Sequence, residues 1–217
     1  MSNDESDDFE TRRLLTQEGI DFSKFGRDVG TVHDIPLDDF LKMFATNKET
    51  GLAKSYCKSA RQTFGLNVIP APVSLPSWLC CLLPCLSYSK TLSKFNDCLP
   101  DHSEVLRDSR WILLDTSSIV PGDLIRLGRH DRVPADARII EILDNSKCLF
   151  DTSAVSGSPE EKVINVKNST NNYLDAQNMI FAGYLCKEGS CMGVVVATGP
   201  LTHLGKLISK GEWPVAR

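Results

Sequence analysis

Val120-Pro-Gly-Asp-Leu-Ile-Arg-Leu127, followed at once by Asp131-Arg-Val-Pro-Ala-Asp136, is the stretch that decides the fold. Pro-Gly-Asp and Pro-Ala-Asp are turn-forming tripeptides, because proline presets φ and glycine and aspartate tolerate tight backbone geometry. The apolar residues beside them are mostly Val, Ile and Leu, which favour strands. The stretch therefore predicts short strands joined by tight turns.

The same pattern of short apolar runs separated by turn residues extends through the rest of the chain beyond Pro100. Five short strands are expected, at residues 104–107, 111–114, 123–127, 138–143 and 193–198. Short strands at close spacing are typical of an antiparallel roll or barrel. A helix over residues 201–210 is expected to close this β domain.

The N-terminal half shows helical spacing instead. Leu37, Phe40, Leu41 and Phe44 recur every three or four residues, which predicts a helix over 36–45. A second helix is expected over 52–64, ending at Gly65. The fold class is therefore α+β: an antiparallel β-roll preceded by a short helical hairpin and a disordered acidic tail.

Composition and charge limit the function. The chain has 217 residues and a net charge of −4, so it has no basic excess for binding nucleic acid. Residues 1–35 contain nine acids and four bases, and few apolar side chains to offset the entropy of ordering. We expect four parts: a disordered tail (1–33), a helical region (34–68), a Pro/Cys-rich apolar linker (69–100) and the β domain (101–217).

The linker contains an apolar run from Leu75 to Leu86. Pro84 breaks it, and it is shorter than the roughly 20 residues of a membrane-spanning helix. Its three cysteines, Cys80, Cys81 and Cys85, are candidates for lipid attachment that would hold residues 75–86 at a membrane surface. Buried structural thiols are the alternative, and the paired spacing of a zinc site is missing. No cofactor or metal is expected.

Several blocks of sequence, in the same order along the chain, bear a family resemblance. The two opening blocks, Phe150-Asp-Thr-Ser-Ala-Val-Ser-Gly157, Asn178-Met-Ile-Phe-Ala-Gly183 and Gly193-Val-Val-Val-Ala-Thr-Gly199 resemble the actuator domain of P-type cation-transporting ATPases. Residues 37–67 resemble the N-terminal region of the type II pumps, the calcium and sodium/potassium kinds. Together these segments cover most of residues 36–210.

The resemblance implies a function and also exposes a departure from it. In the family, ATP phosphorylates an aspartate in an Asp-Lys-Thr-Gly-Thr motif, and the glutamate of the actuator's Thr-Gly-Glu-Ser loop positions the hydrolytic water. This chain has no Asp-Lys dipeptide, and Ser156-Gly157-Ser158-Pro159 stands in place of that loop. A neutral hydroxyl cannot replace a carboxylate as a base toward water. Glu160 and Glu161 are expected to be solvated acids.

Two functions stay open. The first is a non-catalytic, actuator-like module, without transmembrane, nucleotide-binding or phosphorylation parts, that binds a P-type ATPase or its phosphorylation domain. The second is a truncated or partial chain of a cation-transporting P-type ATPase, whose complete form hydrolyses ATP. An independent enzyme of another class has little support. The expected location is cytoplasmic, at the cytoplasmic face of a membrane if residues 75–86 contact lipid.

Overall fold

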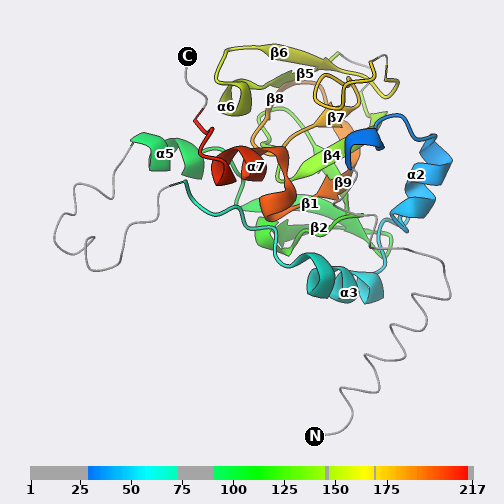
Figure 1. The fold of residues 1–217 in the computed structure, drawn as a ribbon. Coiled ribbons are helices and arrows are strands. Elements are labelled where there is room, and N and C mark those ends of the chain that lie inside the picture. Colours follow the sequence, from blue (N-terminus) through cyan, green and yellow to red (C-terminus); the bar gives the residue numbers. More distant parts are fainter. Residues whose placement is uncertain (1–28, 73–89, 145–146, 169, 215–217) are drawn as a thin grey trace, which may run out of the picture.

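A β domain with helices on its outside forms the molecule (Figure 1). The computed structural model describes residues 29–72, 90–144, 147–168 and 170–214. Its α-helices are α2 (Leu37–Met43), α3 (Lys54–Phe64), α5 (Lys90–Asn96), α6 (Ser153–Ser156) and α7 (His203–Ser209). Short 3-10 helices are η2 (Val29–Thr31), η4 (Thr116–Ser118) and η5 (Gly199–Leu201). The strands are β1 (His102–Arg107), β2 (Arg110–Asp115), β3 (Leu124–Leu127), β4 (Asp136–Ile142), β5 (Cys148–Asp151), β6 (Glu161–Ile164), β7 (Met179–Ile180), β8 (Leu185–Glu188) and β9 (Cys191–Ala197).

Two antiparallel sheets make up the β domain. The six-stranded sheet has the order β2-β1-β3-β9-β4-β7, and the three-stranded sheet has the order β6-β5-β8. β9 is the last strand in the sequence, yet it lies between β3 and β4. The β1–β2 hairpin turns through Asp108 and Ser109, whose φ angles are +47° and +62°, as a tight two-residue turn requires.

One apolar core joins both sheets to the N-terminal region. Ile125 and Val194 of the larger sheet and Phe150 and Cys186 of the smaller sheet are all 0% exposed and belong to one cluster. Phe40 of α2 is in the same cluster, also 0% exposed. The helical region therefore shares its core with the β domain.

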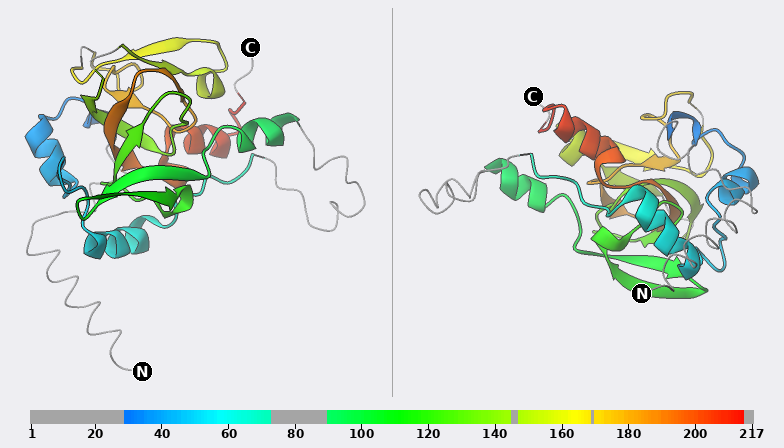
Figure 2. Two further views of the ribbon diagram at one scale, coloured as in Figure 1. Left: turned by 180° about the vertical axis from the view of Figure 1, so that it is seen from behind. Right: turned by 60° about the horizontal axis from the view of Figure 1, so that its bottom comes forward.

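Helices α2 and α3 each pack on the β domain, in different places (Figures 1 and 2). The spacing of Phe40 and Phe44 puts both rings on the inner face of α2, with centroids 4.8 Å apart. Tyr56 and Ala60 of α3 form a second, smaller cluster with Leu52 and Val120. The two consecutive helices thus each turn an apolar face to the domain, in separate apolar clusters.

The α+β prediction is confirmed, and the five expected strands and three expected helices are present within one to two residues at most ends. Four strands were not predicted: β5, β6, β7 and β8. The predicted tail lies outside the described residues up to position 28, but Val32 and His33 are buried, with exposures of 5% and 2%. Part of the segment assigned to the tail is therefore part of the core.

Candidate functional site

The candidate loop, residues 156–159, connects α6 to β6 at the edge of the smaller sheet (Figure 1). Two hydrogen bonds from Thr152 to Glu160, one from the backbone and one from the side chain, close the base of the loop. The N–H of Thr152 donates to the carbonyl of Glu160 at 3.0 Å, and the Thr152 hydroxyl donates to the same carbonyl at 3.2 Å. Thr152 is buried, with 5% exposure, so the loop projects from a fixed base.

Inside the loop, hydrogen bonds occupy the Ser156 hydroxyl and leave Ser158 at the surface. Ser156 Oγ donates to the Ser158 carbonyl at 3.0 Å and lies 3.2 Å from Thr152 Oγ1. Gly157 ends α6 with φ +75°, in the left-handed region that glycine tolerates, and its N–H donates to the Ser153 carbonyl at 3.1 Å. Ser158 and Pro159 are exposed.

The two carboxylates that follow Ser158 most closely in the sequence lie at the surface. Glu160 and Glu161 are both exposed, as predicted. Glu161 Oε1 lies 3.2 Å from Lys187 Nζ, which also lies 3.5 Å from Asp151 Oδ2. The backbone N–H of Glu160 donates to the Ser158 carbonyl at 2.8 Å, which fixes this end of the loop.

A pocket of about 340 Å³ adjoins the loop. Its wall includes Ser156, Glu160, Lys162, Tyr184 and His203. Burial lowers the pKa of Lys162 to about 8, while its ammonium donates to the Leu174 carbonyl at 3.0 Å. Burial, together with the charges of Lys206 and Lys210, lowers the pKa of His203, which favours the neutral imidazole.

Sequence reasoning located the loop but missed this pocket. Its residues come from α6, β6, the segment before β7, the turn before β8, and α7, which are spread along the chain. The Leu-Thr-His-Leu spacing near His203 carried no recognisable catalytic pattern. Only the fold brings these side chains together.

The two turn aspartates support the fold, as the turn chemistry predicts. Asp123 accepts the Val120 N–H at 2.8 Å and contacts the Arg107 guanidinium. Asp136 accepts the N–H groups of Ala182 and His203, at 2.9 and 2.7 Å. Burial raises the pKa of Asp136 to about 7, against the effect of these two bonds.

The predicted lipidation residues Cys80, Cys81 and Cys85 lie outside the described residues. Cys98 is buried and its Sγ donates to the Lys94 carbonyl at 2.9 Å. Across the described ranges, no three His, Cys, Asp or Glu side chains are grouped in a way that could hold a metal ion. In that same part of the chain, no helix has the length and apolar character needed to cross a membrane.

The two antiparallel sheets and the loop between α6 and β6 agree with the expected actuator-type domain. A family model described as the P-type ATPase actuator domain matches residues 97–212, and a model of the cation transporter/ATPase N-terminus matches residues 32–86. The first match covers more than half of the chain. The chain therefore belongs to the P-type ATPase actuator-domain family, which confirms the resemblance.

Its curated relatives include sodium/potassium-transporting ATPase alpha subunits. The alpha-A subunit of Artemia franciscana is 24% identical over 246 residues, covering 85% of this chain and 24% of that subunit. The alpha-3 subunit of Homo sapiens is 32% identical over 144 residues, covering 61% of this chain and 14% of the relative. The alpha-2 subunit of Gallus gallus is 32% identical over 131 residues, covering 58% and 13%.

The chain thus spans about a quarter or less of the length of these relatives. The alignment with the Artemia subunit is longer than the 217 residues of this chain. It therefore includes stretches of that subunit that have no counterpart here.

Proposed function

We propose that this chain is a non-catalytic actuator module that acts by binding another protein, a P-type ATPase or its phosphorylation domain. One observation carries the proposal. Ser158 stands at the position where the P-type pumps that this chain resembles have the glutamate that positions the hydrolytic water. Ser158 is exposed at the loop tip, and its hydroxyl holds its proton too tightly to serve as a base.

The surroundings of the loop support this proposal. Glu160 is tied by its backbone to both Thr152 and Ser158, and Glu161 is engaged with Lys187. Moving either carboxylate to the tip would require breaking these contacts. The loop nevertheless keeps a fixed base and an exposed tip, which suit it for contact with a partner.

The test is to assay the purified chain for hydrolysis of ATP and of an acyl phosphate, alone and with an added P-type ATPase phosphorylation domain. We expect no turnover above background in either assay. Ser158→Ala should leave this result unchanged, while Ser158→Glu asks whether the loop still supports water activation once the acid is restored. Turnover by the unaltered chain that disappears in Ser158→Ala would overturn the proposal.

Binding needs its own measurement, because an inactive chain is not thereby a binding module. We expect the phosphorylation domain to bind the chain, and Ser158→Arg at the loop tip to weaken that binding at least tenfold. A substitution on the distant β2 edge, Leu113→Ser, is the matched control, since Leu113 is 70% exposed. Equal binding by both variants would exclude the loop as the contact surface.

A second function, a partial chain of a cation-transporting P-type ATPase, is favoured by the small share of each relative that the chain covers, 13–24%. In this case the module's partner domains belong to the same polypeptide. Sequencing the coding region beyond the codon for Arg217 separates the two proposals. An open frame carrying Asp-Lys-Thr-Gly-Thr would favour this second function and remove the stand-alone module.

We further propose that the module works at the cytoplasmic face of a membrane, held there through residues 75–86 and acylation of Cys80, Cys81 and Cys85. The apolar composition of this run supports the proposal. Fractionation of cells that express the chain tests it. Membrane association that survives replacement of all three cysteines by serine would rule out acyl anchoring.

A further inference from the structure

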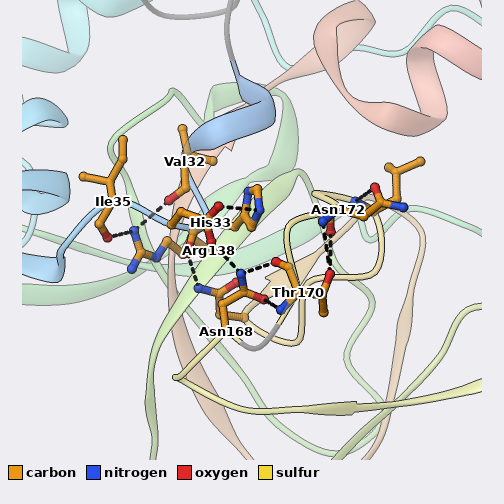
Figure 3. Close-up of polar contacts among 10 residues, drawn as sticks. Val32, His33, Ile35, Arg138, Asn168, Thr170 and Asn172 are labelled. Carbon is orange, nitrogen blue, oxygen red and sulfur yellow. Dashed lines mark hydrogen bonds and ion pairs between the residues drawn. The ribbon is translucent and has the colours of Figure 1, made fainter.

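Residues 32–35, here called the N-terminal strap, are held on the β domain through their backbone. Arg138 Nη1 of β4 donates to the carbonyls of Val32 and Ile35, both at 2.7 Å (Figure 3). Asn178 Nδ2 donates to the carbonyl of His33 at 2.9 Å. Because these hydrogen bonds involve backbone carbonyls, they hold the strap in one conformation.

The strap side chains complete the interface. His33 is 2% exposed, and its Nε2 lies 3.1 Å from Asp34 Oδ2 without the alignment of a hydrogen bond. Asn168 Nδ2 donates to Asp34 Oδ1 at 2.7 Å. The loop of residues 165–178 therefore contacts the strap at Asn168 and at Asn178.

Polar atoms at this interface are left without hydrogen-bond partners within the described part of the chain. They are both ring nitrogens of His33, Tyr173 Oη, Asn178 Oδ1 and Arg138 Nε. Burying an unpaired polar group costs free energy. The unpaired atoms therefore offset part of the stabilisation that the hydrogen bonds of the strap provide.

A continuous row of rings leads from the strap to the pocket beside the loop. His33 meets Tyr173 edge-on, with ring centroids 6.0 Å apart, and Tyr173 meets Phe181 at 5.3 Å. Phe181 in turn lies 5.3 Å from the His203 ring and 5.3 Å from Lys162 Nζ. His203 and Lys162 both line the pocket.

We propose that the N-terminal strap controls the pocket beside residues 156–159: the docked strap holds Tyr173 and Phe181, and these rings hold Lys162 and residues 170–178 in the observed arrangement. Release of the strap frees Tyr173, loosens the packing over Phe181 and admits water to Lys162. The strap is therefore a positioning device for the candidate contact surface. An effect of the strap on partner binding rests on the proposed function, but the coupling between the strap and the pocket does not.

The test measures the strap and the pocket separately in the full chain. Arg138→Met removes both carbonyl bonds while keeping an apolar stem over the Phe40 ring, which the guanidinium carbon covers at 4.5 Å. Hydrogen exchange should then speed up at least threefold in residues 32–35 and also in 170–176. The pH midpoint for labelling of Lys162 by an amine reagent should move from about 8 toward 10.5.

Asp34→Ala is the milder variant, since the Asp34 side chain is 53% exposed and only its contacts with Asn168 and His33 are lost. Asp34→Ala should change the hydrogen exchange and the Lys162 labelling midpoint in the same direction by a smaller amount. It provides the test of the proposal if Arg138→Met does not fold. Arg126→Met is the matched control: Arg126 also covers a ring, that of Trp111 at 4.7 Å, on another part of the domain.

Faster exchange in the strap with an unchanged Lys162 midpoint and unchanged exchange in 170–176 would overturn the proposal. So would equal shifts in the Arg126→Met control, because the effect would then be general loosening. Neither readout requires a partner protein. Failure of partner binding and failure of this coupling are therefore distinguishable.

Discussion

Asp123 carries its carboxylate inside the protein, where its side chain is 0% exposed. Arg107 Nε lies 2.7 Å from Asp123 Oδ1, and the contact raises the pKa of Arg107 although burial opposes its charge. Removing one partner of a buried pair leaves the other charge uncompensated. We expect Asp123→Ala to lower the free energy of unfolding by about 3–5 kcal/mol, measured by urea denaturation.

The control is the pair between Glu104 and Arg126, whose side chains are 37% and 41% exposed. Glu104→Ala should cost about 0–1 kcal/mol, because water screens an exposed pair. Similar losses in both variants would mean that the Arg107–Asp123 pair does not stabilise the fold through its burial.

Lys162 should make stability depend on pH above neutrality. Burial lowers its pKa from the ordinary 10.5 to about 8, so between these values the unfolded chain binds more protons and the unfolding free energy rises with pH. Lys162→Met should be more stable than the unaltered chain at pH 7, by roughly 1 kcal/mol after solvent screening. This advantage should shrink as the pH rises from about 8 toward 10.5. An advantage of the same size at pH 7 and pH 10 would contradict the assignment.

At the scale of the element, α7 depends on its N-cap. Thr202 is 0% exposed, its Oγ1 accepts the Gly205 N–H at 3.0 Å and lies 2.7 Å from the Gly199 carbonyl. Thr202→Ala should lower the unfolding free energy by about 1–2 kcal/mol. Thr202→Ser keeps the hydroxyl and should lose less than half as much. If the two variants lose equally, the cap bond is not the cause.

Elements with a clear apolar period could be predicted from the sequence. The run at 138–143 is apolar because β4 lies inside its sheet, and the spacing of Phe40 and Phe44 reflects the one buried face of α2. β6 could not be predicted in this way. It is an edge strand with exposed Glu161 and Val163, so it lacks the apolar pattern of an inner strand.

The candidate site was predictable only in part, for a related reason. Ser156–Pro159 is one continuous stretch, so its place between α6 and β6 follows from local sequence and the family resemblance. The pocket depends on contacts between Lys162, Tyr184 and His203, which lie in three segments. The burial of His33 was missed because its acidic surroundings indicate a solvated tail.

For the molecule as a whole, Gly51 joins the helical region to the β domain. Its φ is +69°, and a Cβ there would lie 2.0 Å from the Leu106 carbonyl oxygen. Next to it, Leu52 bridges to Arg107 of β1. Gly51→Ala should therefore force the two regions apart and destabilise both, by more than about 3 kcal/mol.

Gly65→Ala is the matched control. Gly65 has a similar φ of +74° but no atom within 4 Å of the added Cβ, so only backbone strain of about 1 kcal/mol is expected. Thermal unfolding followed by circular dichroism compares the two variants. If Gly51→Ala loses no more stability than Gly65→Ala, the close contact between Gly51 and Leu106 is not needed for stability.

The central position of β9 has a consequence for synthesis. Until residues 191–197 have left the ribosome, β3 and β4 lack the strand that separates them, and each presents an open edge rich in Ile and Leu. Open edges of this kind pair with other chains. We therefore expect a message cut short before codon 191 to yield an aggregating chain instead of a smaller working domain.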